Sequence, residues 1–575
     1  MLKLIRFLKA YKKECVIGPL FKFLEACFEL VVPLITAGII DTGIKNNDIA
    51  YIYKMGGVMV FFGLTGLACS LTAQYFAAKA SMGFGTALRT AFFKHICSLS
   101  YTEIDEIGTP SLITRLTGDI NQAQAGVNLV LRIFLRSPFI VIGAVIMAFF
   151  VNVKLALIFL LATPVIGAVI YFVMSRTIPY YRRIQAIMDR VSLLTRENLA
   201  GVRVIRAFSK QEKEVEEFDK TCDSLMNEQV VAGKIGALLN PATYVVINAA
   251  IIALIWGGGF QVDTGDLTQG EVIALVNYMS QILLALLAVA ILIISFTKAS
   301  ASARRINEVF ELLPSLTEKT EHSALQTDKP RVSFENVSFA YQKSEADALT
   351  DISFDVPVGA TVGIIGGTGC GKSTLMNLIA RFYDATKGRV LIDGADVRDL
   401  PFAVLRQKIG VVPQKAVLFK GTIRDNLRWR DKDASDDELW QTLKIAQGAD
   451  FIKSKPQGLD TMVTQGGKNL SGGQRQRLTI ARALVGHPEI LILDDSASAL
   501  DFATDAKLRK AIKQKTKGMT VFLVSQRVST IKNADFIVVL DDGKTVGIGT
   551  HEELLESCPV YREICLSQLE KEDAA

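Results

Sequence analysis

The sequence predicts a chain in two parts: a membrane α-helical domain with six transmembrane helices and long cytoplasmic extensions, and then an α/β domain of the P-loop type. The chain has 575 residues, too many for one ordinary domain, and half of them are hydrophobic. Long apolar segments fill the first half, and a glycine-rich phosphate-binding motif lies in the second. We therefore expect a membrane domain over residues 1–305, a linker over 306–329 and the α/β domain over 330–575.

Six apolar segments predict the membrane spans, because each approaches the roughly 20 residues that a bilayer-crossing helix needs. They run over Cys15–Ile40, Tyr53–Phe76, Val127–Phe150, Lys154–Met174, Tyr244–Val262 and Val272–Phe296. The alternative is a large soluble helical core, which six such segments in one half of the chain disfavour. The positive mean hydropathy of the whole chain, +0.31, agrees with a membrane protein.

The distribution of Lys and Arg predicts how the spans are oriented. Basic residues are frequent in Met1–Glu14, Ala77–Gly126 and Ser175–Pro241, whereas the short loops between the other spans carry only Lys45. The positive-inside rule then places the N-terminus and both long segments in the cytoplasm. Their helical pattern suggests that the spanning helices continue beyond the membrane and turn there. The same rule explains the net charge of +6 without a nucleic-acid partner.

Charged residues inside two spans need a reason, because each is costly in lipid. The first span carries Lys22, Glu25 and Glu29 on one helical face, and the third carries Arg132 and Arg136 one turn apart. Since both spans enter from the cytoplasm, the two sets lie at similar depth, and we expect Glu–Arg pairs that face a cavity. Two interpretations stay open, a structural or gating pair and direct contact with a substrate.

The segment Gly366–Thr374, GGTGCGKST, fits the P-loop motif and lies between a strand-like and a helix-like apolar run. Its glycines turn backbone N–H groups towards phosphate oxygens, and the following helix adds its positive end. We expect Lys372 to reach the β- and γ-phosphates and Ser373 to hold Mg²⁺. The predicted nucleotide-binding residues are Gly366, Gly367, Thr368, Gly369, Cys370, Gly371, Lys372, Ser373 and Thr374.

Further motifs follow the P-loop in a fixed order. Val411–Gln414 is an apolar run that ends in a polar side chain, and Leu470–Gln474 reads LSGGQ. Ile490–Leu493 predicts a buried strand that leads into Asp494 and Asp495. An apolar run before a carboxylate is typical of the second Mg²⁺-site residue in P-loop proteins, which singles out Asp494.

Leu470–Gln474 resembles the signature of ATP-binding-cassette proteins, and its order relative to the other motifs matches that family. Six spans ahead of one cassette resemble an exporter half-transporter over nearly the whole chain. The resemblance implies an α/β P-loop ATPase domain with a helical signature subdomain, and ATP and Mg²⁺ as cofactors. In that family Tyr341 would stack on adenine, Gln414 would contact Mg²⁺ and the attacking water, and Asp494 would hold Mg²⁺. The signature residues would cap ATP bound to a second subunit; they are Ser471, Gly472, Gly473 and Gln474.

Three positions depart from the family's pattern: Asp495 replaces a Glu, Gln526 replaces a His, and Gln465 replaces a frequent Glu. Asp is one methylene shorter than Glu, so the carboxylate of the general base lies roughly 1 Å too far back, a misplacement that can cost ~10²-fold in rate. Gln526 can donate a hydrogen bond to the γ-phosphate, but it cannot be protonated at physiological pH as His can. The catalytic set Asp495, Gln526 and Gln414 therefore predicts a slow ATP site beside an intact signature.

A weak site of its own and a good signature for a partner resemble one half of a heterodimeric bacterial multidrug exporter. The resemblance implies ATP-driven efflux of hydrophobic or amphipathic compounds across a bacterial plasma membrane, with the N-terminus and the cassette in the cytoplasm. The partner would be a second half-transporter that carries the usual Glu and His. The turns near Thr114–Ile120 and Phe208–Glu212 would press on the cassettes. The alternatives are a homodimer with two slow sites, a peptide or lipid exporter, and a regulatory ATP-binding subunit.

Overall fold

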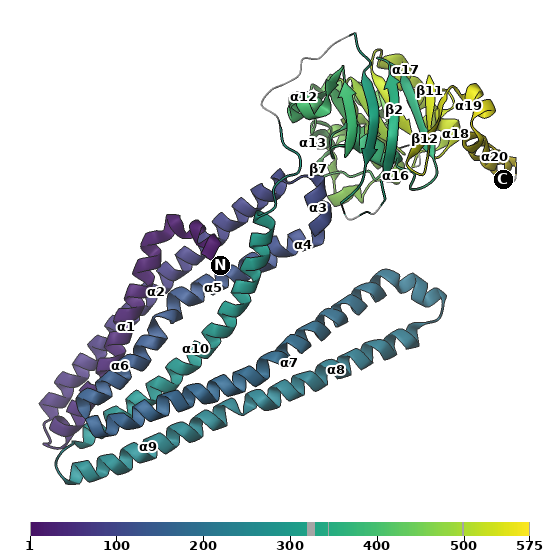
Figure 1. Cartoon of the computed structure of the whole chain (residues 1–575). Helices are drawn as coiled ribbons and strands as arrows, with labels where there is room; N and C mark the ends of the chain where they lie inside the picture. The colour runs from purple at the N-terminus through teal and green to yellow at the C-terminus, as the bar shows by residue number, and fades with distance from the viewer. Residues whose placement is uncertain (1, 319–327, 343, 345, 497–498, 574–575) are drawn as a thin grey trace. The chain divides into compact units, whose positions relative to one another are not determined.

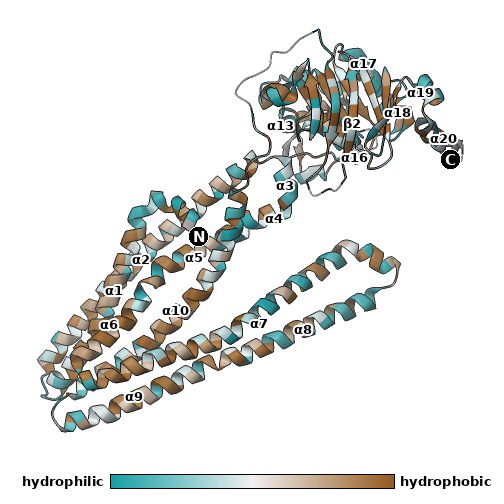
Figure 2. Cartoon of the chain, in the orientation of Figure 1, coloured by the Kyte–Doolittle hydropathy of each residue, from teal (hydrophilic) through white to brown (hydrophobic). Residues whose placement is uncertain are grey.

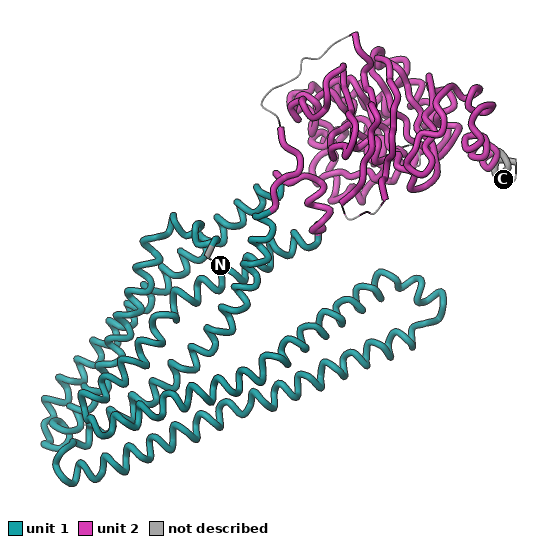
Figure 3. The backbone as a smooth tube through the Cα atoms, in the orientation of Figure 1, with its two compact units in different colours: residues 1–97, 110–311 teal, residues 98–109, 312–575 magenta. Residues whose placement is uncertain are grey.

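The computed structural model describes residues 2–318, 328–342, 344, 346–496 and 499–573. The chain forms two compact units, which we describe separately (Figure 3). Unit 1 comprises Met1–Cys97 and Pro110–Glu311, and unit 2 comprises Ser98–Thr109 and Leu312–Ala575. A short segment from the first half of the chain thus belongs to the second unit.

Unit 1 is helical and contains the six predicted membrane spans (Figure 1). Its long helices are α1 (Lys12–Gly38), α2 (Ile49–Ser98), α6 (Arg136–Val151), α7 (Val153–Ala207), α8 (Gln211–Ala237), α9 (Leu239–Asp263) and α10 (Gln269–Phe310). Hydrophobic residues dominate α6 and α9, and polar residues are frequent along α8 (Figure 2). Large apolar side chains such as Leu64, Leu161 and Trp256 are exposed on the protein surface, as lipid-facing positions require.

Shorter helical segments complete unit 1. A 3₁₀-helix, η1 (Leu2–Tyr11), leads into α1, and three π-helical segments interrupt the spans. These are η2 (Ile39–Ile44), η3 (Arg115–Asp119) and η4 (Val130–Phe134), with α4 (Thr109–Thr114) and α5 (Ile120–Leu129) before and after η3. Helix α10 continues to Phe310, beyond the start of the predicted linker.

The expected turn near Thr114–Ile120 is wrong, because the chain there runs through α4, η3 and α5 without a break. The turn lies earlier, where Gly108 adopts a left-handed φ of 81° and α4 begins at Thr109, with Pro110 in its first turn. Gly after a helix and Pro at the start of the next are the usual stop and start signals. The short helix α3 (Tyr101–Ile107) precedes this turn and belongs to unit 2. The second expected turn, at residues 208–210, separates the antiparallel neighbours α7 and α8 (Figure 1).

Unit 2 is built on a six-stranded sheet in the order β12-β11-β3-β10-β9-β6. Its strands are β3 (Thr361–Gly366), β6 (Ile409–Val412), β9 (Ile490–Asp494), β10 (Thr520–Val524), β11 (Phe536–Asp541) and β12 (Lys544–Gly549). Only β12 is antiparallel to its neighbour. The central strands are almost wholly buried, as parallel strands covered on both faces are expected to be. Their carboxyl ends therefore meet at one edge.

A four-stranded antiparallel sheet in the order β2-β1-β4-β5 packs against the central sheet through a shared core around Phe334, Leu375 and Phe522. Its strands are β1 (Val332–Phe339), β2 (Leu349–Val356), β4 (Lys387–Ile392) and β5 (Ala395–Asp396). The helix after the P-loop, α11 (Lys372–Ile379), contributes Leu375 to this core. The predicted α/β domain is thereby confirmed.

A helical subdomain with its own apolar core follows β6 and contains the signature. Its elements are α13 (Ile423–Leu427), α14 (Asp436–Ile445), α15 (Ala449–Lys453) and α16 (Gly472–Leu484), with the short pair β7 (Gly421–Thr422) and β8 (Met462–Val463). The remaining helices of unit 2 are α12 (Phe402–Lys408), α17 (Phe502–Lys515), α18 (Val528–Ile531), α19 (His551–Ser557) and α20 (Pro559–Asp573).

Candidate nucleotide-binding site

The carboxyl ends of four parallel strands surround one cavity of about 200 Å³. The P-loop follows β3, Gln414 follows β6, the Asp pair ends β9 and Gln526 follows β10. Ten of the predicted site residues line this cavity: Thr368, Gly369, Gly371, Lys372, Ser373, Thr374, Gln414, Asp494, Asp495 and Gln526. Open α/β sheets bind ligands at this edge, so side chains up to 158 positions apart in the sequence meet where a nucleotide would be held.

The P-loop conformation depends on glycine. Gly371 has a φ of 96°, and a Cβ there would lie 2.7 Å from the backbone oxygen of Ala348. Gly366 is tighter, since its Cβ would lie 2.0 Å from the oxygen of Leu540. Lys372 is buried, and its ammonium donates to the carbonyl oxygens of Gly366 (2.9 Å) and Gly367 (2.5 Å). The positive charge therefore lies against the loop whose N–H groups suit phosphate.

Ser373 and Asp494 form an oxygen pair at the start of α11 and the end of β9. The Ser373 hydroxyl donates to Oδ1 of Asp494 over 3.1 Å. Burial raises the pKa of Asp494, the neighbouring Asp495 adds to the rise, and the bond from Ser373 opposes it. Hard oxygen donors of this kind suit Mg²⁺. Within the described residues no three His, Cys, Asp or Glu side chains are grouped as a metal site.

Asp495 has a left-handed backbone, with φ at 44°. Its N–H donates to the oxygen of Val524, which fixes this conformation between β9 and β10. Its Oδ2 accepts from Nε2 of Gln414 over 3.4 Å, so the carboxylate faces the cavity. Asp tolerates left-handed φ better than most side chains. The local backbone thus suits the residue that departs from the family pattern.

The position of Gln526 depends on a residue that sequence reasoning missed. The side-chain amide of Gln568 in α20 donates to the backbone oxygen of Gln526 (2.7 Å) and accepts from the N–H of Val528 (2.9 Å). These two bonds fix the segment after β10 from both sides. Nothing in the sequence around Gln568 marks it, because the contact joins positions 42 residues apart without a motif.

Tyr341 lies in a second cavity of about 440 Å³. The Tyr341 hydroxyl lies 3.0 Å from Oγ1 of Thr374, a residue that lines the first cavity. Its ring packs edge-on against Phe339 and Tyr383, with centroid distances of 4.8 and 5.4 Å. Residues Thr102 and Asp105 of α3 also line this cavity. An adenine ring held over Tyr341 would therefore lie beside α3.

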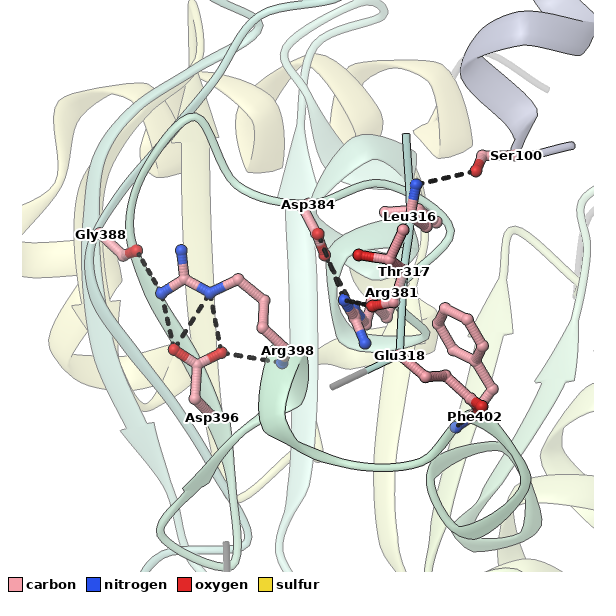
Figure 4. A network of polar contacts seen from close by, with 10 residues as sticks. All are labelled: Ser100, Leu316, Thr317, Glu318, Arg381, Asp384, Gly388, Asp396, Arg398 and Phe402. Atoms are coloured by element: carbon pink, nitrogen blue, oxygen red, sulfur yellow. Dashed lines mark hydrogen bonds and ion pairs between the residues drawn. The ribbon is translucent and has the colours of Figure 1, made fainter. Parts of the chain in front are cut away.

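The start of the linker is tied to both α3 and the cassette (Figure 4). From α3 and its cap, Glu103 accepts from the N–H of Ser315 (3.1 Å), and the Ser100 hydroxyl accepts from the N–H of Leu316 (3.0 Å). From the cassette, Arg381 donates to the oxygen of Thr317 (3.0 Å). We call residues 315–318 the strap.

Arg381 is the buried anchor of the strap. Its side chain also pairs with Asp384 at 2.9 Å and stacks on the ring of Phe402. The N–H of Phe402 donates to Glu318, the last residue of the strap, over 2.7 Å. Arg381, Phe382 and Tyr383 lie one residue beyond the end of α11, and neither composition nor spacing marked them in the sequence.

The signature begins α16 and does not line the P-loop cavity. Ser471 caps the helix: its hydroxyl accepts from the N–H of Gln474, and the Gln474 side chain accepts from the N–H of Ser471. Gly472 and Gly473 have no side chains, so Ser471 and Gln474 provide the capping contacts of this first turn. Within the described residues, none of the signature positions shares the cavity with Lys372 and Asp494. The N-terminal end of α16 therefore lies outside the cavity that Lys372 and Asp494 line.

Of the predicted cavity residues, Glu25, Glu29 and Arg136 form ion pairs between helices, whereas Arg132 forms none with any residue that the structure describes. Arg136 in α6 lies 2.7 Å from Glu29 and 3.7 Å from Glu25, both in α1. Lys22 lies 2.5 Å from Glu25 and donates to Ser70 in α2 over 3.1 Å. The ion pairs therefore connect α1 with α6 and, through Ser70, with α2.

Comparisons with known proteins agree with this geometry. Residues 15–287 match the model of the ABC transporter transmembrane region, and residues 349–498 match that of the ABC transporter family. An uncharacterized ABC transporter ATP-binding protein of Mycobacterium bovis is 38% identical over 99% of this chain and 98% of its own length. The ATP-dependent lipid A-core flippase of Hahella chejuensis is 34% identical over 90% and 88%. A solved bacterial Atm1-family ABC exporter with ATP bound shares the fold, with a TM-score of 0.80, 24% identity and 97% and 98% coverage.

Proposed function

We propose that this chain, which belongs to the ABC transporter family, supplies one half of a heterodimeric exporter and leaves most ATP hydrolysis to its partner's P-loop. The chain joins six membrane-spanning helices to one ATPase domain. The observation that carries the need for a partner is the separation of the signature at Ser471–Gln474 from the cavity around Lys372. A site with both parts requires a second cassette, whose P-loop faces this signature.

In the site of this chain, Lys372 and the loop N–H groups hold the phosphates, and Tyr341 stacks on adenine. Ser373 and Asp494 would hold Mg²⁺, which would neutralise charge on the phosphate oxygens. Gln414 orients the attacking water, and Asp495 accepts its proton. Gln526 donates a hydrogen bond to the γ-phosphate.

We infer that this site turns over slowly. The Asp495 carboxylate ends one methylene short of the reach of Glu, and its Oδ2 already accepts from Gln414. Gln526 cannot take up the positive charge that a His would carry. The signature has no such change, so the partner's site, completed by Ser471 and Gly473, would be the fast one. The partner would then carry Glu and His at the matching positions.

ATP binding closes the two cassettes, and the membrane helices change from inward- to outward-facing. The differential affinity of ATP for the closed pair supplies the free energy for this change. The substrate is hydrophobic or amphipathic and enters from the cytoplasm or the inner leaflet of a bacterial plasma membrane. The N-terminus and the cassette are cytoplasmic.

The test is purification of the tagged chain from native membranes, identification of the co-purifying chain by mass, and ATPase assays on Asp495→Asn. We expect a second cassette chain with Glu and His, and at least half of the wild-type ATPase rate in the variant, because the partner's site carries turnover. A homodimer whose ATPase falls ~10²-fold or more in Asp495→Asn would overturn the asymmetric pair. Asp501→Asn, a helix cap outside the cavity, is the control.

A further inference from the structure

We propose that the membrane domain binds the acidic headgroup of an amphiphile at Arg132, whose positive charge no carboxylate of α1 neutralises. This inference names a substrate class and rests on the export function proposed above. The charged groups concerned are Lys22, Glu25 and Glu29 of α1, Arg132 of η4 and Arg136 of α6.

Both carboxylates of the group are already neutralised. Glu29 pairs with Arg136 at 2.7 Å, and Glu25 pairs with Lys22 at 2.5 Å. The backbone oxygen of Glu29 also accepts from Gln281 of α10, which ties the group to a third helix. A cationic substrate would have to displace one of these partners, so the two glutamates do not by themselves favour cations.

Arg132 is the cation left over. It is half-buried, its Nε lacks a hydrogen-bond partner, and it forms no ion pair with any residue that the structure describes. Three cations against two carboxylates leave one positive charge in excess. A charge inside a span is costly unless a partner or a ligand compensates for it. An anionic group on the substrate would supply that compensation.

The backbone around Arg132 supports a binding role. Arg132 lies in the π-helical turn Val130–Phe134, which contacts both α1 and α10. Single π-helical turns inside α-helices are frequent at functional sites. Arg136 follows one turn later, so the two guanidinium groups lie on neighbouring positions of one helix face. A phosphate or carboxylate between them could bind Arg132 directly. It would have to compete with Glu29 for Arg136.

The depth of Arg132 is that of a lipid headgroup. The outer end of α6, Val151, lies nineteen residues beyond Arg132 and fifteen beyond Arg136. At ~1.5 Å per residue these distances are about 28 and 22 Å. In a hydrocarbon core of ~30 Å Arg132 then lies within about 2 Å of the cytoplasmic boundary, and Arg136 lies about 8 Å from it. A lipid-like molecule of the inner leaflet carries an acidic headgroup at this boundary while its chain stays apolar.

The experiment uses the whole transporter, with its partner chain, in lipid nanodiscs and in vesicles. The probes are lysophosphatidylglycerol and lysophosphatidylcholine with the same acyl chain, and glycerol phosphate without one. ATPase stimulation gives the half-maximal concentration of each probe, and fluorescent forms of both lysolipids report ATP-dependent transport. We expect the anionic lysolipid to act at about tenfold lower concentration than the zwitterionic one, and glycerol phosphate to have no effect.

Variants of Arg132 test the assignment. Arg132→Gln should raise the half-maximal concentration of lysophosphatidylglycerol about tenfold and leave that of lysophosphatidylcholine within twofold. Arg132→Lys should keep most of the preference, which separates lost charge from lost folding. Arg182→Gln, on an exposed position of α7, removes the same charge elsewhere and should keep the wild-type preference.

Equal transport of both lysolipids, or an unchanged preference in Arg132→Gln, would overturn this inference and leave the export function standing. Stimulation by glycerol phosphate as strong as by the anionic lysolipid would assign the site to a free anion and overturn the amphiphile. ATP-dependent movement of neither lysolipid would likewise overturn the inference and leave the export function standing.

Discussion

The hydroxyl of Tyr383 donates a 2.6 Å hydrogen bond to Oδ2 of Asp105, and the same tyrosine ring packs edge-on against Tyr341. Burial, and then the bond to Asp105, raises the pKa of Tyr383 well above its usual value, so the hydroxyl remains a donor at physiological pH. One side chain thus touches both α3 and the aromatic residue proposed to stack on adenine. Because α3 follows α2 in the chain after two residues, we expect this bond to be one route that helps transmit nucleotide binding to the membrane helices.

Tyr383→Phe tests this route, because it removes the hydrogen bond and keeps the ring. A hydrogen bond to a charged group contributes about 1.5–3 kcal/mol, and partial exposure reduces that here. We expect nucleotide affinity to change less than twofold, and substrate stimulation of the ATPase to fall about threefold to tenfold. The measurement is the ratio of stimulated to basal ATPase, with nucleotide affinity measured separately. Asp105→Asn keeps an acceptor and should lose less, and equal stimulation in Tyr383→Phe and wild type would contradict the route.

Arg381→Ala should destabilise unit 2, because it leaves the oxygen of Thr317 and the Asp384 carboxylate without their common donor. Removing one partner from a buried charge pair costs about 3–5 kcal/mol. The measurement is unfolding by denaturant. A lower midpoint concentration with an unchanged dependence of the unfolding free energy on denaturant would show the loss of stability. Arg381→Lys keeps the charge but not the planar fork, and should recover only part of the loss. Arg389→Ala, at an exposed ion pair with Glu335, is the control and should cost under ~1 kcal/mol.

Acidification should weaken Mg²⁺ binding. The loss should begin at a higher pH than it would if the metal-binding Asp had its usual pKa. Only the ionised Asp494 carboxylate binds the cation, and burial raises the pKa of Asp494. The ionised form predominates above that pKa, so affinity for Mg²⁺ is lost as the pH falls through it. The measurement is Mg²⁺-dependent nucleotide binding between pH 7.5 and 5, with the same titration in a chelator as the control. Asp494→Asn should bind Mg²⁺ weakly at every pH, and a pH-independent wild type would contradict the argument.

The sequence was informative where one local pattern decides the structure. Apolar runs about as long as a bilayer-crossing helix predicted the spans. The glycines around Lys372 predicted the P-loop, whose conformation leaves no room for a side chain at Gly371. It was uninformative where the partner lies far away in the chain. The bonds from Gln568 to Gln526 and from Arg381 to Thr317 join unmarked residues, so only the folded chain reveals them.

Two outcomes depended on competition between nearby groups. Glu25 and Glu29 were expected to pair with Arg132 and Arg136. Spacing alone does not say which arginine binds them, and Arg136 pairs with both carboxylates while Arg132 pairs with neither. The turn predicted near Thr114–Ile120 was wrong because two glycine-containing segments could each have formed it. Gly118 in the predicted turn fits inside a helix without a steric reason to leave it, whereas Gly108 and Pro110 end one helix and begin the next.

The proposed asymmetry predicts that two variants of this chain have unequal effects on the assembled complex. Ser471→Asp places a negative charge where the partner's γ-phosphate is expected. Asp caps helices about as well as Ser, so α16 should stay folded. We expect the ATPase rate of the complex to fall ~10²-fold or more, as after the loss of a key donor at developing charge. Lys372→Ala disables only the slow site and should leave at least half of the rate.

The measurement is the ATPase rate of purified complexes at saturating ATP, with circular dichroism to verify that each variant is folded. Equal losses in Ser471→Asp and Lys372→Ala would indicate two equivalent sites and contradict the asymmetric pair. A larger loss in Lys372→Ala would reverse the assignment, because turnover would then depend on the P-loop of this chain. Asp495 would in that case act as an effective base despite its shorter side chain, held in place by its left-handed backbone and by Gln414.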